Sequence, residues 1–305
     1  MWERLFKRKS TAERFNDYPF WSNLYLVNEV LRILLYKKIK GGDKVFTEEE
    51  KQRIIYLNER RYSYKEMAEE LNTTECSLQK FFKENNIKKM PYKKDKFLRE
   101  DFFTNITTEE QAYLLGLLKT DGYIKKRSKG QTLVGISLKS SDRYMIEKIK
   151  ELFNSNRKIY HDGRMGKECD AIEINSEIMV KDLSKFEIIP RKTYLLKDIH
   201  IEQIPKHLQR HYLRGLLDGD GTVCYDTGYL VVGFCGYNEE FVRSFQYAID
   251  EYLERDVHNV IKKTNAYNCK WKGKQCLKIL EYLYKDSTIA LERKKKFYID
   301  NKIKI

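Results

Sequence analysis

The sequence lacks any uninterrupted apolar run long enough to cross a bilayer. Its most apolar stretch, residues 18–36, is broken by polar residues such as Asn23 and Glu29, and it predicts an amphipathic helix buried against another part of the protein. The N-terminus has no continuous apolar segment, so we expect no signal peptide. These absences exclude a protein anchored by helical membrane spans.

Cysteine pairs at metal-ligand spacing are also lacking, because no two cysteines form a CxxC pattern. The six cysteines are Cys76, Cys169, Cys224, Cys235, Cys269 and Cys276. We therefore expect buried, reduced thiols of a cytosolic protein rather than a zinc site or a disulfide framework.

Aromatic and basic residues, in contrast, are abundant. The 22 Tyr and 15 Phe, within a hydrophobic fraction of 41%, predict folded domains rather than a disordered chain. A length of 305 residues suffices for two or three compact units. The 59 basic residues exceed the 45 acidic residues and give a net charge of +14. Such an excess suits a polyanionic partner, either nucleic acid or an acidic membrane surface.

A basic segment with little hydrophobic periodicity, residues 83–99, divides the sequence. We assign residues 1–99 to an N-terminal helical region that ends in this linker. Residues 100–203 and 204–305 are then two repeats. No motif indicates a role for residues 1–44.

The N-terminal region predicts one helix followed by two shorter ones. Residues 46–61 form the first, with Thr47 as its cap. Residues 63–86 resemble a helix-turn-helix, in which the second helix enters the major groove of DNA. The candidates for DNA contact on it are Thr74, Glu75, Ser77, Gln79 and Lys80. An ordinary pair of antiparallel helices is the alternative.

A nine-residue pattern occurs twice in the rest of the chain. It reads LLGLLKTDG at residues 114–122 and LRGLLDGDG at residues 213–221, and every matched position is offset by 99 residues. Each copy has one glycine early in an apolar helix and an Asp-Gly pair at its end. The leucines recur at helical spacing and are expected to be buried in their own repeat.

The two glycines predict that these helices touch. Gly116 is followed four residues later by Thr120, and Gly215 by Gly219, so each helix has a face of small residues. Small residues let two helix backbones approach closely. We therefore expect the two helices to cross in direct contact, with the repeats related by a pseudo-twofold axis.

The same order of elements follows each copy. After the first helix we expect strands over 122–126 and 132–138, a helix over 141–153, strands over 157–160 and 171–175, and a helix over 176–185. After the second we expect strands over 221–226 and 229–235, a helix over 238–253, strands over 257–264 and 267–271, a helix over 273–285, and a last helix. The predicted fold is α+β, with two pseudo-symmetric αββαββα repeats, antiparallel sheets with helices on one face, and a small all-α N-terminal domain. The open face of each sheet can meet a ligand.

Asp121 and Asp220 end the two helices. Helix C-termini carry partial negative charge, so two carboxylates brought there repel each other unless a cation binds or one takes a proton. Oxygen ligands with open positions suit Mg²⁺. A divalent ion beside a phosphate and an activated water serves phosphodiester hydrolysis. The pattern therefore predicts Asp121 and Asp220 as ligands of a divalent metal ion.

The paired motif resembles the signature helices of the LAGLIDADG homing endonucleases in their single-chain, two-repeat form, over residues 103–305. The resemblance implies a saddle of antiparallel sheets on a long double-stranded DNA site, read in the major groove. Asp121 and Asp220 would cleave it with Mg²⁺ or Mn²⁺. It also implies a cytoplasmic monomer without a membrane partner, from a bacterium, a phage or another mobile element. The family's first acidic position falls on Lys119 and Asp218, so the first copy departs from the motif.

The resemblance further implies a basic residue near each acidic centre. By position these are Lys192 and Lys294, each directly after an arginine. Such a lysine would stabilise transition-state charge or orient water. A solvated surface lysine is the alternative for both. Lys139 is a weaker candidate, because its counterpart in the second repeat is near Cys235.

Polar side chains in or beside the predicted strands are expected to contact DNA. Arg and Lys read guanine and Gln reads adenine, and others meet phosphates. In the first repeat the candidates are Lys125, Arg127, Lys129, Gln131 and Lys139. In the second repeat they are Tyr225, Asp226, Lys262, Lys270 and Lys272.

Two other functions are compatible with the same scaffold. A DNA-binding regulator would keep the helix-turn-helix and lose cleavage, and the two intact aspartates argue against it. An RNA maturase, which would help an intron to fold, stays open. A nuclease embedded in an intein is disfavoured, because Met1 and Ile305 are not the ends expected of a self-splicing element.

Overall fold

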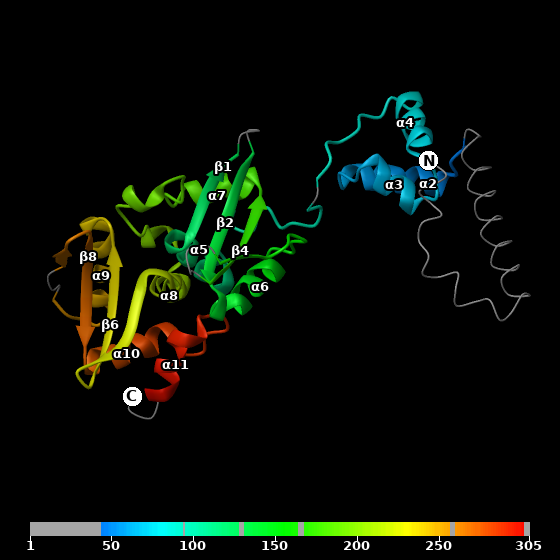
Figure 1. The fold of residues 1–305 in the computed structure, drawn as a ribbon. Helices are drawn as coiled ribbons and strands as arrows, with labels where there is room; N and C mark the ends of the chain where they lie inside the picture. Colours follow the sequence, from blue (N-terminus) through cyan, green and yellow to red (C-terminus); the bar gives the residue numbers. More distant parts are fainter. Residues whose placement is uncertain (1–43, 94, 128–130, 164–167, 257–259, 302–305) are drawn as a thin grey trace, which may run out of the picture. The chain divides into compact units, whose positions relative to one another are not determined.

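The structure is a computed structural model that describes residues 44–93, 95–127, 131–163, 168–256 and 260–301 (Figure 1). The chain divides into two compact units between Lys96 and Phe97. The helix expected over residues 18–36 and the candidate Lys129 lie outside the described residues. None of the described helices combines the length and apolarity that a bilayer span requires.

The described part of the first unit, which starts at residue 44, is helical, as the sequence predicts. Its helices are α2 (Glu48–Glu59), α3 (Tyr64–Glu70) and α4 (Glu75–Glu84). Each helix begins after a hydroxyl residue whose side chain accepts a hydrogen bond from the first turn; these residues are Thr47, Ser63 and Thr74. Apolar side chains from all three helices form one buried core.

The basic segment expected as a linker packs against this first unit. The side chain of Asn58 donates to the carbonyl of Lys88 at 3.0 Å and accepts from the amide of Met90 at 2.9 Å. Lys96 pairs with Glu66 at 2.8 Å. Main-chain and side-chain contacts therefore attach residues 88–96 to the helical unit, so this part of the segment is not a free tether.

The second unit begins with the first repeat. Its elements are α5 (Glu109–Thr120), β1 (Gly122–Lys126), β2 (Thr132–Lys139), α6 (Arg143–Leu152), β3 (Tyr160–Asp162), β4 (Cys169–Asn175) and α7 (Glu177–Ser184). The strands form an antiparallel sheet in the order β1-β2-β4-β3. Thr108 caps α5 in a capping box with Gln111, which explains where this helix starts.

The second repeat has the same order of elements. They are α8 (Gln209–Asp220), β5 (Gly221–Asp226), β6 (Tyr229–Gly236), α9 (Glu239–Tyr252), β7 (Ile261–Lys263), β8 (Ala266–Lys272) and α10 (Lys274–Tyr284), followed by α11 (Glu292–Asn301). The sheet order is β5-β6-β8-β7, again antiparallel. The predicted αββαββα order is confirmed in both repeats. The third strand of each repeat differs, because β3 and β7 each contain three residues and begin three or four residues later than expected.

The helices α5 and α8 contact each other through their glycines, as predicted. A Cβ atom added to Gly116 would lie 2.3 Å from the carbonyl oxygen of Tyr212. One added to Gly215 would lie 2.1 Å from the carbonyl oxygen of Tyr113. No larger residue fits at either point, because the obstructing atoms belong to the backbone of the other helix. Figure 1 shows α5 and α8 between the two sheets.

One hydrophobic core extends through both repeats. Alternate strand residues are buried in it, such as Ile136 in the first sheet and Val232 in the second. Lys125 in the first sheet and Lys270 in the second are exposed, and each lies on the face of its sheet that points away from the core. Helices therefore cover one face of each sheet and leave the other available to a ligand, as the alternation of residues predicts.

A buried ion pair also joins the repeats. Arg214 of α8 is fully buried and donates to a carboxylate oxygen of Glu109 in α5 at 2.6 Å. The same guanidinium donates to the carbonyls of Leu283 at 2.7 Å and Ile289 at 3.0 Å. Burial raises the pKa of Glu109, but the hydrogen bond from His211 and the charge of Arg214 outweigh it and lower the pKa to about 2. The pair therefore stays ionised near neutral pH.

Gly215→Ala is expected to separate the paired helices, because a methyl group has no room beside the Tyr113 carbonyl. We expect the free energy of unfolding to fall by about 3 kcal/mol, the upper part of the range for an overpacked core. Gly163→Ala is the matched control, since its added Cβ would meet only side-chain atoms at 3.5 Å or more. Urea denaturation measures both variants. Equal stability of the two would show that the helices do not touch at Gly215.

Candidate active site

The two acidic residues of the repeated motif end the paired helices. Asp121 is the C-cap of α5, and Asp220 is the last residue of α8. Their neighbours interlock, because a Cβ atom added to Gly219 would lie 1.9 Å from the hydroxyl oxygen of Thr120 and 3.2 Å from Oδ2 of Asp121. The Asp121 carboxylate therefore lies against the last turn of α8, directly before Asp220.

Both carboxyl groups are shifted toward the neutral form. Burial and then the charge of Asp220 raise the pKa of Asp121 to about 6. Burial also raises the pKa of Asp220, and Lys192 and Lys294 oppose this rise. Among the described residues, neither carboxylate accepts a hydrogen bond or has a cation within ion-pair distance. Two such groups favour binding a proton or a cation between them.

Lys192 and Lys294 stand at the ends of the two helices but make different contacts. Lys192 Nζ donates to the carbonyl of Thr120 at 2.7 Å, at the end of α5. Lys294 Nζ lies within 2.7 Å of three carbonyl oxygens of residues 217–221, at the end of α8. Each ammonium neutralises the negative end of a helix. Acceptors therefore engage all three protons of Lys294, whereas Lys192 has one acceptor in the part of the chain that the structure describes.

The surface-lysine alternative is wrong for both residues. Lys192 is 5% exposed and Lys294 is 4% exposed. Burial lowers the pKa of each to about 8, although the charges of Asp121 and Asp220 act in the opposite direction. Both lysines are thus buried cations electrostatically coupled to the acid pair.

Lys119 and Asp218, at the first acidic position of the motif, serve the fold. Asp218 accepts from the hydroxyls of Tyr113 at 2.8 Å and Tyr284 at 2.6 Å. Lys119 donates to the carbonyl of Phe186 at 2.8 Å. Both side chains are fully buried. Neither is therefore available to a ligand beside Asp121 and Asp220.

A second acidic group, near Lys119, has a structural explanation. Asp198, His200 and Glu202 could place three ligand atoms within 4.8 Å of one another. Burial lowers the pKa of Lys119 to about 8, while the charges of Glu187, Asp198 and Glu202 raise it. His200 also has Glu187 within 3.3 Å. These acids balance a buried ammonium, and we assign no metal site there.

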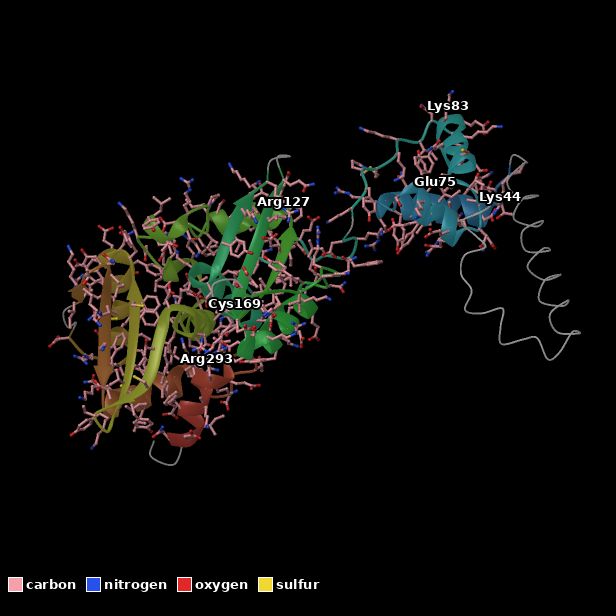
Figure 2. All side chains as sticks on the ribbon, in the orientation of Figure 1. Lys44, Glu75, Lys83, Arg127, Cys169 and Arg293 are labelled. Carbon is pink, nitrogen blue, oxygen red and sulfur yellow. The ribbon has the colours of Figure 1, made fainter. Side chains whose placement is uncertain are left out.

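The sequence does not predict two further residues beside the acid pair. The first is Arg293, which Figure 2 labels at the start of α11. Its charge lowers the pKa of Asp121, and its guanidinium donates to Asp142 at 2.9 Å. The thiol of Cys235 donates to the carbonyl of Asp220 at 3.2 Å. The position of Arg293 directly before Lys294 is the one signal that could have identified it. No signal of this kind exists for Cys235.

The strand register identifies the residue of the second repeat that matches Lys139. The first glycine of β1 pairs with the fifth residue of β2, and the first glycine of β5 pairs with the sixth residue of β6. Counted from these pairs, the counterpart of Lys139 is Tyr237, two residues after Cys235 and, as expected, not a lysine. The second hairpin is one residue shorter than the first, which the sequence motif alone does not reveal. Lys139 itself is exposed at the end of β2.

The DNA-contact candidates of the first sheet are exposed. Lys125 and Arg127 both lie near Glu173, at 3.5 and 3.0 Å. Gln131 is exposed, and its carbonyl accepts from the amide of Arg127 at 2.8 Å. Figure 2 labels Arg127 just beyond the end of β1 that is distant from α5. Lys125 and Arg127 therefore face a carboxylate rather than standing alone.

The candidates of the second sheet are also exposed. Lys262 lies on β7, and Lys270 and Lys272 lie on β8. Tyr225 donates to the side chain of Asn301 at 2.9 Å, so it supports the packing of α11. Asp226 stands exposed at the end of β5. The second sheet thus presents a row of lysines.

The candidates on α4 have two different environments. Thr74 Oγ1 accepts from the amide of Ser77 at 3.1 Å, so both residues form the helix cap. Glu75, Gln79 and Lys80 are exposed. Lys80 lies 3.7 Å from Glu84 on the same helix.

The family model of the LAGLIDADG-like domain matches residues 108–186. No curated protein matches the chain. Among solved structures, the chain is similar to the LAGLIDADG meganuclease I-AabMI bound to uncleaved DNA, with 15% identity, a TM-score of 0.45, and coverage of 65% of this chain and 92% of that chain. It is similar to the I-LtrWI LAGLIDADG homing endonuclease bound to target DNA, with 14% identity, a TM-score of 0.43, and coverage of 67% and 90%. It is also similar to the LAGLIDADG meganuclease I-CpaMI bound to uncleaved DNA, with 11% identity, a TM-score of 0.45, and coverage of 65% and 90%.

From the match of the family model, residues 108–186 carry a LAGLIDADG-like domain, and residues 209–284 repeat its order of helices and strands.

Proposed function

We propose that this protein is a site-specific endonuclease that hydrolyses double-stranded DNA with Mg²⁺ or Mn²⁺. The observation that carries the proposal is the pair of aspartates at the ends of two touching helices. Asp121 and Asp220 have raised pKa values and no hydrogen-bond donor among the described residues. A purely structural pair of carboxylates would be expected to have donors, as Asp218 has.

The donor set fits a hard divalent cation. Asp121 and Asp220 would hold it through carboxylate oxygens, which Mg²⁺ prefers. A bound divalent ion supplies a Lewis acid for a phosphate oxygen and lowers the pKa of a coordinated water. The protein contributes the helix contact that fixes the separation of these two half-buried carboxylates. Lys192 and Lys294 limit the repulsion between the two acids.

The two lysines are assigned different roles. Lys192 has two N–H groups without an acceptor in the described residues, so it can donate to a phosphate oxygen of the substrate. Lys294 is occupied by three carbonyls and positions the end of α8. Lys192 is therefore the catalytic candidate, and Lys294 is a positioning residue.

Double-stranded DNA is the substrate that fits the rest of the chain. Each repeat offers an exposed sheet face with basic residues, and the chain carries a net charge of +14. The helical unit exposes Gln79 and Lys80 on α4, which supports a second DNA contact. One chain supplies both halves of the acid pair, so we propose that the monomer is active.

A regulator without cleavage activity and an RNA maturase are the competing functions. No feature of the site favours either, because neither requires two carboxylates without donors. DNA binding without cleavage in any divalent metal would favour the regulator. Restored intron splicing in place of DNA cleavage would favour the maturase.

Asp121→Asn and Asp220→Asn are each expected to abolish cleavage, because each removes a negative ligand without changing side-chain shape. The assay is linearisation of a supercoiled plasmid library with Mg²⁺, with binding measured in parallel. Asp300→Asn is the matched control, since Asp300 is exposed on α11. We expect a loss of at least about a hundredfold for the first two variants and none for the control. Full cleavage by Asp121→Asn with an intact fold would refute the mechanism.

Lys192→Met and Lys294→Met are expected to fail in different ways. Lys192→Met is expected to reduce the cleavage rate by about a hundredfold, the effect typical of one lost transition-state donor. It leaves one carbonyl unpaired and costs about 1 kcal/mol of stability. Lys294→Met removes the ammonium from three carbonyls, of which that of Leu217 keeps another donor, the amide of Gly221, and it is expected to cost about 3 kcal/mol. Single-turnover kinetics and urea denaturation test both, and equal effects of the two variants would contradict these roles.

Metal binding is expected to depend on pH through Asp121. Protons compete with the cation, so the apparent affinity for Mg²⁺ should fall about tenfold per pH unit below about 6. Without metal, folded Asp121 holds its proton to a higher pH than unfolded Asp121 does. The free energy of unfolding therefore falls as pH rises from about 3.8 to about 6. Thermal unfolding with and without Mg²⁺, at pH 5 and pH 8, measures both effects. Asp121→Asn should weaken both effects, with Asp220 left as the remaining raised carboxyl group, and Asp300→Asn should keep them in full. An unchanged metal response in Asp121→Asn would exclude this site.

A further inference from the structure

The open faces of the two sheets differ in charge at one matched pair of positions. Gly135 of β2 pairs with Glu173 of β4, and Gly233 of β6 pairs with Lys270 of β8. Each glycine also pairs with the second residue of the strand that follows the catalytic aspartate. The two glycines are therefore equivalent points of the repeats. A carboxylate stands beside one of them, and an ammonium stands beside the other.

Glu173 is the centre of a polar cluster on the first sheet. Tyr123 lies across Gly135, because a Cβ atom added to this glycine would lie 2.3 Å from the tyrosine ring. From there the Tyr123 hydroxyl donates to Glu173 at 3.2 Å. Lys125 and Arg127 reach the same carboxylate at 3.5 and 3.0 Å. The glycine thus makes room for a tyrosine that fixes the carboxylate, and the carboxylate holds two cations.

Lys270 has no such surroundings on the second sheet. Thr222 takes the place of the tyrosine opposite Gly233, and a Cβ atom added to this glycine would meet nothing closer than 3.4 Å. Lys270 is exposed, and no carboxylate of the described residues lies within ion-pair distance of it. The ammonium is therefore available to an acceptor outside the protein.

We propose that Glu173 and Lys270 are specificity-determining residues that select opposite base chemistries at symmetry-related positions of the DNA target. This inference rests on the proposed function, because it requires both sheets to lie in the major groove. A carboxylate accepts from the amino group of cytosine or adenine, whereas an ammonium donates to the acceptors of guanine or thymine. The target should therefore present an amino hydrogen to Glu173 and an acceptor to Lys270.

Glu173 has a second effect on binding through the cations that it holds. Lys125 and Arg127 are engaged with its carboxylate, which draws them away from phosphates. Removing the negative charge releases both cations toward the DNA backbone. Each new phosphate contact steepens the dependence of log affinity on log salt by about one. Loss of Glu173 should therefore raise non-specific affinity while it lowers discrimination.

The test is selection from a randomised duplex library by the full chain, with wild type, Glu173→Gln and Lys270→Gln compared at several salt concentrations. Glu147→Gln is the control, because Glu147 is exposed on α6 and pairs with Arg143 there. It removes the same charge from the helical side of the sheet. Thermal unfolding checks the fold of each variant, and Lys270 is exposed enough for its variant to fold even if Glu173→Gln does not.

We expect Glu173→Gln to lose about tenfold discrimination at one base pair and to steepen the salt dependence by up to about two. Lys270→Gln should lose discrimination at the symmetry-related base pair of the other half-site. Glu147→Gln should keep its discrimination at every base pair. Unchanged preferences in folded Glu173→Gln or in Lys270→Gln, beside a selective wild type, overturn this inference alone. A wild type that selects no sequence overturns the proposed function together with it.

Discussion

Direct backbone contact between α5 and α8 is the constraint on which the rest of the second unit depends. The contact requires glycine at two points, Gly116 and Gly215, where any side chain would strike the partner helix. Because the helices meet there, their C-termini end together and bring two half-buried carboxylates into one place. The same contact holds the two sheets at fixed positions relative to each other. The arrangement of the two repeats and the position of the two carboxylates therefore both depend on the contact between α5 and α8.

The repeats share a plan but differ in how they support it. A lysine neutralises the end of each signature helix, yet Lys294 is saturated by carbonyls and Lys192 is not. The first acidic position of the motif is the buried Lys119 in the first repeat and the buried Asp218 in the second, and the two side chains have different hydrogen-bond partners. The open faces differ as well. Such differences give each half of the molecule its own chemistry on a common backbone.

The sequence could predict what depends on local pattern. The repeated motif, the glycine spacing and the alternation of apolar residues are sufficient for the element order and for the contact between the two helices. It could also place Asp121 and Asp220 at the helix ends. It could not reveal that Lys294 engages three carbonyls, nor that Glu173 lies between Lys125 and Arg127, because these contacts depend on register and on residues far apart in the chain. Nor could it reveal that the second hairpin is one residue shorter, which makes Tyr237 the counterpart of Lys139.

The contact between Thr120 and Gly219 has a consequence for how the two repeats relate to one another. The hydroxyl of Thr120 occupies the space where a side chain at residue 219 would be, at 1.9 Å from an added Cβ atom. Two copies of the first repeat would bring two threonines into that space, and two copies of the second would leave it empty. At this contact the repeats are therefore complementary rather than identical. Fusion in one chain guarantees that each meets its counterpart.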